Sequence, residues 1–109
     1  MLTNKHLMPC PLAAALQIFG SRTKILIIAE LMSGTKRFSE LNKSIPCTHK
    51  VLVSNLRELE SDSIITRKIY PVIPPKVEYT LTDVGRSLED IIEKIGEWGI
   101  DYIELNKVK

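Results

Sequence analysis

Cysteine, glycine, aromatic side chains and long apolar runs are all scarce in this chain of 109 residues. Two cysteines, Cys10 and Cys47, are too few for the disulfide framework that stabilises small secreted domains, which favours a reducing cytoplasm. No apolar run approaches the roughly 20 residues of a membrane-spanning helix. The N-terminal segment also lacks the apolar stretch of a secretion signal, so we expect no membrane partner.

The residue patterns on which enzymes depend are missing as well. The chain has no phosphate-binding loop, no glycine-rich dinucleotide motif, and no serine or cysteine beside a plausible base. Four side chains of the types that bind zinc are present, but without the spacing of a zinc finger: His6, Cys10, Cys47 and His49. We therefore expect neither an enzyme nor a bound cofactor or metal.

The net charge is small, but its distribution along the chain is uneven. The formal charge is +2. Residues 36–76 hold eight basic side chains against four acidic ones, whereas residues 77–109 hold four basic against eight acidic. This asymmetry favours a basic surface over residues 36–76 that binds nucleic acid, and a different role for the acidic residues 77–109. Ordinary solvated helix faces would also produce such a split by chance in some proteins.

The length favours one domain, and we expect an N-terminal arm over residues 1–8 followed by a single domain over residues 9–109. Pro11 follows Cys10 at the first position of a predicted helix, where its missing N–H costs nothing. Ser39 is the expected N-cap of a short helix. The predicted helices span residues 10–19, residues 22–32, a short stretch from residue 39, and residues 48–61.

The segment 48–61 carries the clearest functional pattern. Its inward stripe is apolar and consists of Leu52, Leu56 and Leu59. Its outward face mixes hydrogen-bond donors with positive charge, as expected of a helix that enters the DNA major groove. Residues near the helix start are expected to approach bases, and the last one to contact phosphate. The expected contacts are Thr48, His49, Lys50, Ser54 and Arg57. The other reading is a polar face that only meets water.

A two-stranded ribbon is predicted directly after this helix. Residues 64–70 are rich in β-branched side chains, residues 77–81 alternate, and the prolines between them stiffen the tip. Such prolines also protect strand edges from aggregation. A helix followed by a basic ribbon is the layout of a winged helix-turn-helix, a mainly helical α+β fold with its wing over residues 64–81. Further expected DNA contacts are Arg37, Ser39, Arg67, Lys68 and Lys76.

The two ends of the domain are expected to join two copies of the chain. Residues 82–105 predict one long helix, capped by Thr82, with an apolar stripe longer than so small a domain can cover. A two-fold dimer would suit a palindromic operator. Helices 10–19 and 82–105 would form the interface through Leu12, Leu16, Ile91, Ile95, Trp98 and Tyr102. The other reading is a long helix folded back on its own core.

Several motifs within residues 9–104 act together as a signature. They are Cys10-Pro11, Lys36-Arg37-Phe38-Ser39-Glu40-Leu41, Leu56-Arg57-Glu58-Leu59-Glu60, Pro74-Pro75-Lys76-Val77-Glu78-Tyr79 and Thr82-Asp83-Val84-Gly85-Arg86. In this combination the chain resembles the HxlR family of winged helix-turn-helix transcriptional regulators, which are MarR-like. The resemblance implies a homodimeric bacterial or archaeal regulator with its recognition helix and wing on DNA. Ser63 stands where a glycine is common, and we expect it to cost stability.

We therefore predict a homodimeric, sequence-specific, DNA-binding transcriptional regulator, a repressor that reads a palindromic operator in the cytoplasm, on the nucleoid. Its expected partners are double-stranded operator DNA and a second copy of itself, and the sequence does not indicate an effector. The alternative is a winged helix module that contacts other proteins without binding DNA. Salt separates the two readings, because DNA binding weakens steeply as ionic strength rises.

Cys10 is a candidate sensor of oxidants or electrophiles. The partial positive charge at a helix start favours the thiolate, which is the reactive form of cysteine. The resemblance implies the same role, since some members of the family use a cysteine at this position as a sensor. The other reading is a small buried apolar side chain.

Overall fold

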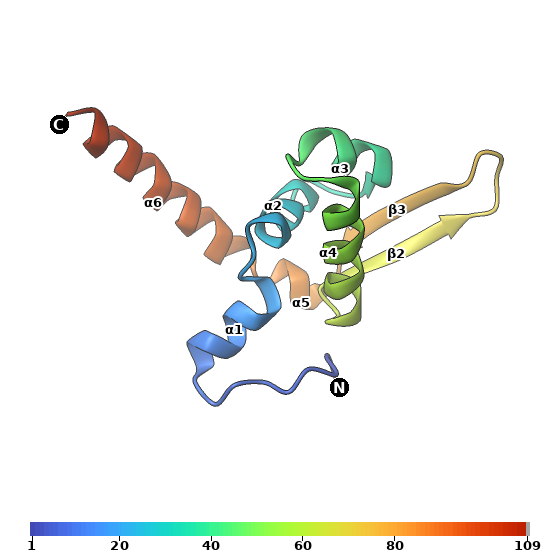
Figure 1. Cartoon of the computed structure of the whole chain (residues 1–109), viewed down its shortest axis with the longest axis horizontal. Helices are drawn as coiled ribbons and strands as arrows, with labels where there is room; N and C mark the ends of the chain where they lie inside the picture. Colours follow the sequence, from blue (N-terminus) through green and yellow to red (C-terminus); the bar gives the residue numbers. More distant parts are fainter. Residues whose placement is uncertain (109) are drawn as a thin grey trace.

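The structure, a computed structural model, describes residues 1–108. Helices α2 (Arg22–Leu31), α3 (Phe38–Ser44) and α4 (His49–Ser61) pack around an apolar core at the centre of the molecule (Figure 1). The largest fully buried side chains come from these helices and from the sheet: Ile27, Ile28, Leu31, Leu41, Leu52, Leu56, Leu59 and Ile65. The leucine stripe predicted for the helix over residues 48–61 is therefore confirmed.

An antiparallel sheet flanks the helices, with strands in the order β1-β3-β2. Its strands are β1 (Lys36–Arg37), β2 (Ile65–Tyr70) and β3 (Lys76–Leu81). The register of the β2–β3 hairpin runs from Ile65 opposite Leu81 to Tyr70 opposite Lys76, so the predicted ribbon forms. The short β1 was not predicted, because two residues are too few to show an alternating pattern. The predicted winged helix-turn-helix, a mainly helical α+β fold, is confirmed.

The start of α3 differs from the prediction. Ser39 is not the N-cap: the helix begins at Phe38, and Arg37 is its cap. Arg37 also belongs to β1, so the chain passes from strand pairing directly into the helix. The Arg37 N–H donates a hydrogen bond to Glu40 Oε1 at 2.9 Å. That bond satisfies a donor that a helix start otherwise leaves unpaired.

Ser63, which links α4 to β2, has a φ of 64°. This is the left-handed region that glycine adopts freely and that costs other residues about 1 kcal/mol. The backbone therefore explains the expected cost of a serine here. Part of the cost is offset, because the Ser63 hydroxyl donates a hydrogen bond to the carbonyl of Leu2 at 2.7 Å.

The single long helix predicted over residues 82–105 is divided in two. Thr82 caps only the short α5 (Asp83–Arg86), where its hydroxyl accepts a hydrogen bond from the Gly85 N–H at 3.0 Å. The chain then bends, and α6 (Glu89–Lys107) begins. The physical reason lies at Gly85, whose backbone is pressed against the base of the wing: a Cβ there would lie 2.2 Å from the Ile64 carbonyl oxygen. The chain must turn before α6 can leave the body.

Adding one methyl group at this contact should be costly. In a Gly85→Ala variant the new Cβ collides with backbone that two hydrogen bonds from Thr82 already hold. Overpacking of this kind costs roughly 1–3 kcal/mol. We expect the free energy of unfolding, measured by urea denaturation, to fall by about 2 kcal/mol. An unchanged denaturation midpoint would contradict the close packing of α5 on the wing.

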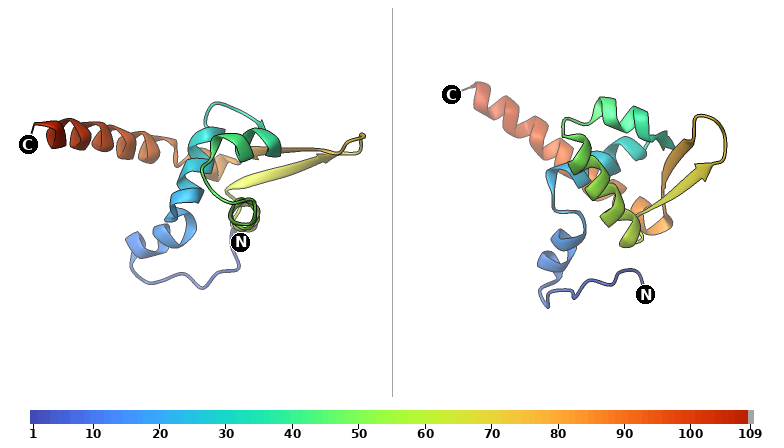
Figure 2. Two further views of the ribbon diagram at one scale, coloured as in Figure 1. Left: turned by 45° about the horizontal axis from the view of Figure 1, so that its top comes forward. Right: turned by 45° about the vertical axis from the view of Figure 1, so that its right-hand side comes forward.

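Helices α1 (Pro11–Phe19) and α6 lie at the edge of the core, to which they contribute the buried side chains of Phe19 and Ile92. The views of Figures 1 and 2 agree that α6 extends from the body on the side opposite the wing, while α1 and the arm leave it elsewhere. Pro11 is the first residue of α1 and Cys10 its N-cap, as predicted. Of the side chains on α6, only Ile92 is buried. Within one subunit, therefore, α6 does not fold back on the core.

Neither terminal helix satisfies the criteria for a membrane span. Among the residues described, no single helix is long and apolar enough to cross a bilayer. The pair α1 and α2, bent by 73°, meets the test by length and composition only.

Candidate nucleic-acid interface

The outward face of α4 brings together most of the residues expected to contact DNA. His49, Lys50, Ser54 and Arg57 are all exposed and line one shallow surface groove of about 530 Å³, together with Val53 and Glu58. Thr48 is the N-cap, and its hydroxyl accepts a hydrogen bond from the Val51 N–H at 3.2 Å. Because the leucine stripe on the opposite face is buried, α4 cannot rotate, and its polar face is fixed toward the outside.

The orientation of His49 depends on a contact that the sequence did not suggest. The rings of His49 and Phe38 meet edge to face, with centroids 5.3 Å apart. Such a pair restricts the imidazole at the first residue of α4. No spacing rule in the sequence connects Phe38 with a side chain on the next helix.

A second groove lies between the start of α3 and the wing. Arg37 lines it from the end of β1, Ser39 from α3, and Lys76 from β3. Its volume is about 590 Å³, and residues 72–75 at the tip of the wing form its far wall. Three of the predicted contacts are thus brought to one place even though they are far apart in the sequence. A groove with two cations and a serine at its edge is suited to a phosphate backbone.

The cations of the wing are held by neighbouring groups. Lys68 Nζ and Lys76 Nζ lie 4.8 Å and 4.6 Å from the centroid of the Tyr70 ring. Lys76 also pairs with Glu78 at 3.3 Å. Desolvation by itself would raise the pKa of Glu78, but hydrogen bonds from Tyr70 and Lys76 outweigh it, and the pKa is lowered. Arg67 differs, because its Nε lies 3.6 Å from Glu60 Oε1 on α4. This pair links the wing to α4.

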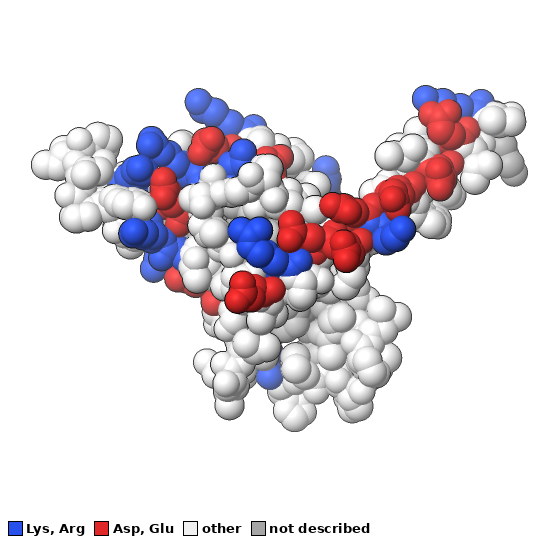
Figure 3. Space-filling model, turned by 180° about the vertical axis from the view of Figure 1, so that it is seen from behind, with Lys and Arg blue, Asp and Glu red and all other residues white. Residues whose placement is uncertain are grey.

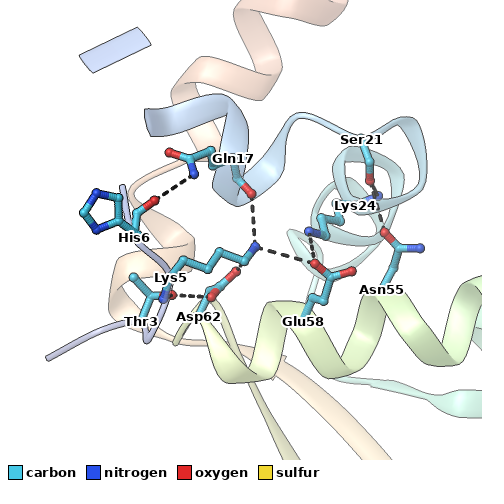
Figure 4. Close-up of polar contacts among 9 residues, drawn as sticks. All are labelled: Thr3, Lys5, His6, Gln17, Ser21, Lys24, Asn55, Glu58 and Asp62. Atoms are coloured by element: carbon cyan, nitrogen blue, oxygen red, sulfur yellow. Dashed lines mark hydrogen bonds and ion pairs between the residues drawn. The ribbon is translucent and has the colours of Figure 1, made fainter. Parts of the chain in front are cut away.

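The C-terminal end of α4 is tied to the N-terminal arm by a group of charges that the sequence did not reveal (Figure 4). Lys5 Nζ lies 2.7 Å from Asp62 Oδ2 and 3.1 Å from the Gln17 carbonyl oxygen. The Thr3 hydroxyl donates a hydrogen bond to the other oxygen of the buried Asp62. Lys24, buried within α2, pairs with Glu58 at 3.1 Å. The arm is therefore anchored, and α4 is held from behind at its last two turns.

One signal in the sequence pointed to this group. Lys24 is the only charge between Arg22 and Glu30, in a helix that is otherwise apolar there. A charge in such a run requires a partner when it is buried. The sequence could not name Glu58 as that partner, because the pairing depends on how α2 crosses α4.

The ion pairs behind α4 predict a dependence of stability on pH. The hydrogen bond from Lys24 lowers the pKa of Glu58 below its ordinary value of 4.5. Burial lowers the pKa of Lys5, but the carboxylates of Asp62 and Glu58 outweigh burial and raise it above 10.5. A lowered carboxyl pKa stabilises the fold above pH 4.5, and this stability is lost as pH falls through the folded-state pKa. The stability that the Lys5 ion pairs contribute is lost only as pH rises through the raised pKa of Lys5.

Replacing Glu58 should flatten the acid limb of that profile. A Glu58→Gln variant should lose less stability than the parent between pH 7 and about pH 3. The difference should be about 0.5 kcal/mol or less, because Glu58 is half exposed and screened by solvent. Urea denaturation at each pH measures it, and Glu93→Gln on the exposed face of α6 is the matched control. Parallel profiles for Glu58→Gln and its parent would contradict the ion pair.

Cys10 is exposed, so the alternative reading of a small buried side chain is wrong. Cys47 is partly buried, and both thiols are free. Among residues 1–108, no group of three or more His, Cys, Asp or Glu side chains is placed to hold a metal ion. His6, Cys10, Cys47 and His49 are therefore not brought together.

The residues expected at a dimer interface are all exposed in the single subunit. They are Leu12 and Leu16 on α1, and Ile91, Ile95, Trp98 and Tyr102 on α6. The rings of Trp98 and Tyr102 stack with centroids 5.1 Å apart. Residues 7–21 contain no Asp, Glu, Lys or Arg. From behind, the lower part of the molecule accordingly shows almost no charge, while acidic groups follow α6 (Figure 3).

Comparisons with known proteins agree with the fold. Residues 18–107 match the family model described as HxlR-like helix-turn-helix. YdeP of Bacillus subtilis, an uncharacterised HTH-type transcriptional regulator, is 44% identical over 94 residues, which are 85% of this chain and 73% of YdeP.

Two solved structures are similar as well. The redox regulator HypR in its oxidised form is 41% identical with a TM-score of 0.80, over 84% of this chain and 96% of HypR. The reduced transcriptional regulator YodB of B. subtilis is 40% identical with a TM-score of 0.70, over 84% of this chain and 91% of YodB. The chain therefore belongs to the HxlR-like helix-turn-helix family and is a transcriptional regulator of the winged helix type.

Proposed function

We propose that two copies of this chain associate through α1 and α6 and repress transcription by binding a palindromic operator. In each copy, α4 enters the major groove and the wing lies along the adjoining backbone. His49, Lys50 and Ser54 approach bases, while Arg57 and Lys76 contact phosphate. The chromosome is then the target, which locates the protein in the cytoplasm at the nucleoid.

The observation that carries this proposal is the fixed outward face of α4. Its donors and cations are exposed and lie in one groove, and the leucines behind them are buried. Phosphate contacts from both grooves would fix the position of the protein on the duplex, and base contacts would give sequence specificity. The exposed apolar side chains on α1 and α6 support a dimer, because large contiguous apolar patches are rarely left exposed to water. The family match supports DNA as the partner.

Selection from a random-sequence duplex library tests the proposal. The full chain should enrich an inverted repeat whose half-sites are about one helical turn apart, since each subunit presents one α4. The alternative is a winged helix that contacts proteins only. No enrichment above a column without protein, combined with no salt-dependent duplex binding, would favour that alternative.

We also propose that Cys10 makes DNA binding responsive to oxidants or electrophiles. Cys10 is exposed at the N-terminus of α1, within the proposed dimer interface, and the similar HypR structure is that of a redox regulator. Oxidation to a disulfide or adduct there would alter how α1 packs and hence the spacing between the two recognition helices.

Diamide treatment gives a direct check on Cys10. We expect the parent protein to lose at least about tenfold in duplex affinity after treatment, a change of about 1.4 kcal/mol. Cys10→Ser should keep its affinity, and Cys47→Ser should respond as the parent does. Fluorescence anisotropy with a selected duplex measures all three. Equal losses in the parent and in Cys10→Ser would exclude Cys10 as the sensor.

A further inference from the structure

We infer that the tip of the wing is an apolar wedge, with Ile73 and Val72 entering the DNA minor groove. The inference rests on the proposed function and adds a contact that none of the predicted polar residues makes. The Ile73 side chain is 101% exposed and that of Val72 is 52% exposed. Both belong to the turn between β2 and β3, and Figure 1 shows this turn at the far end of the hairpin, away from the helices.

The side chains of the tip offer only apolar contacts. Residues 71–75 are Pro-Val-Ile-Pro-Pro, so no side chain between Tyr70 and Lys76 donates or accepts a hydrogen bond. The tip therefore cannot bind a phosphate or read a base edge through polar side chains. Apolar side chains of this kind are the ones that minor-groove proteins insert between base steps.

The tip is also stiff, which reduces the entropy lost when it is inserted. Three of its five residues are proline, and each proline fixes its own φ. The Val72 N–H donates a hydrogen bond to the Tyr70 carbonyl oxygen at 2.9 Å. A rigid element loses less conformational freedom on binding than a flexible loop does.

Charge around the tip favours DNA over an apolar protein surface as its partner. Lys68 and Lys76 lie together over the Tyr70 ring, directly behind the tip. Arg37, at the end of β1, lines the same groove of about 590 Å³ as Lys76. Residues 72 and 73 form the far wall of that groove, so a phosphate backbone seated in it would bring the tip of the wing against the duplex. The wedge would favour pyrimidine–purine steps, which unstack most easily.

Two readouts on the duplex selected by the parent protein test the wedge. The first is affinity: Ile73→Ser should bind about tenfold more weakly, since burial of one isoleucine is worth at least that factor. The second is the fluorescence of 2-aminopurine placed in the flank outside each half-site, which rises when a base is unstacked. The parent protein should raise this signal, and Ile73→Ser should not.

Ile69→Ser is the matched control. Ile69 is also an exposed isoleucine of the wing, at 56%, but it lies in β2 rather than at the tip. It should keep both the affinity and the fluorescence rise of the parent. Lys76→Gln should lower the salt dependence and retain the fluorescence rise.

The outcomes separate the wedge from the proposed function. Duplex binding by the parent together with equal affinity and fluorescence for Ile73→Ser and Ile69→Ser would overturn the wedge alone. A tip that instead serves a protein partner would give that result. Failure of the parent to bind any duplex would overturn both the proposed function and the wedge.

Discussion

Replacing Trp98 by glutamate should convert the protein from a dimer to a monomer. Trp98 is 66% exposed in the subunit and stacks on Tyr102, so in the proposed dimer its indole is an aromatic anchor at the interface. Such anchors contribute about 2 kcal/mol or more each, and two-fold symmetry places two of them in the interface. We expect the dissociation constant of the dimer to rise at least about 100-fold in Trp98→Glu. Analytical ultracentrifugation over a range of concentrations measures it.

The same substitution should leave the folded subunit almost intact. Trp98 does not contribute to the core, so the far-ultraviolet circular dichroism spectrum of Trp98→Glu should match that of the parent. Ile69→Glu provides the control, because Ile69 is similarly exposed but lies on the wing. The Ile69→Glu variant should have the same dimer dissociation constant as the parent. A dimer that survives both Trp98→Glu and Ile95→Glu would show that α6 is not the interface.

Removing three cations from the proposed DNA face should flatten the salt dependence of duplex binding. Lys50 and Arg57 lie on α4, and Lys76 lies on β3 beside the second groove. Each phosphate contact contributes roughly 0.9 to the slope of log affinity against log salt concentration. With two copies per operator, we expect the variant Lys50→Gln, Arg57→Gln, Lys76→Gln to lose up to about five from that slope. Its affinity at low salt should fall by about 10³ or more.

A charge on the other side of the molecule is the control for this experiment. Lys94 lies on α6 with 80% of its side chain exposed and pairs with Glu97. Lys94→Gln removes the same charge without touching either groove, so the slope should stay that of the parent. Nitrocellulose filter binding at several salt concentrations gives both slopes. If the slope decreased by the same amount per removed charge in Lys94→Gln and in the triple variant, the effect would come from net charge and not from the two grooves.

The core and the recognition helix were predictable because their patterns are local. The spacing of Leu52, Leu56 and Leu59 sets which face of α4 is buried, and Thr48 sets where the helix begins. The β2–β3 hairpin was equally clear from its alternation. In each case a short stretch of sequence determines the geometry.

The features that the sequence did not give depend on how separate segments meet. The division between α5 and α6 follows from a backbone contact between Gly85 and Ile64, and β1 exists only because β3 lies beside it. The pairing of Lys5 with Asp62 joins segments 57 residues apart. The proposed wedge could not be predicted from the sequence for another reason. Isolated exposed apolar residues are common, and Ile73 becomes informative only when its place at the end of the wing is known.

The mass of the complex with DNA tests the central claim most directly. Light scattering should give about twice the chain mass of 12.3 kDa for the free protein. On a duplex with one inverted repeat, two chains should bind together, and on a duplex with a single half-site the affinity should fall sharply. A free protein of one chain mass, with equal and independent binding to whole sites and half-sites, would contradict the account.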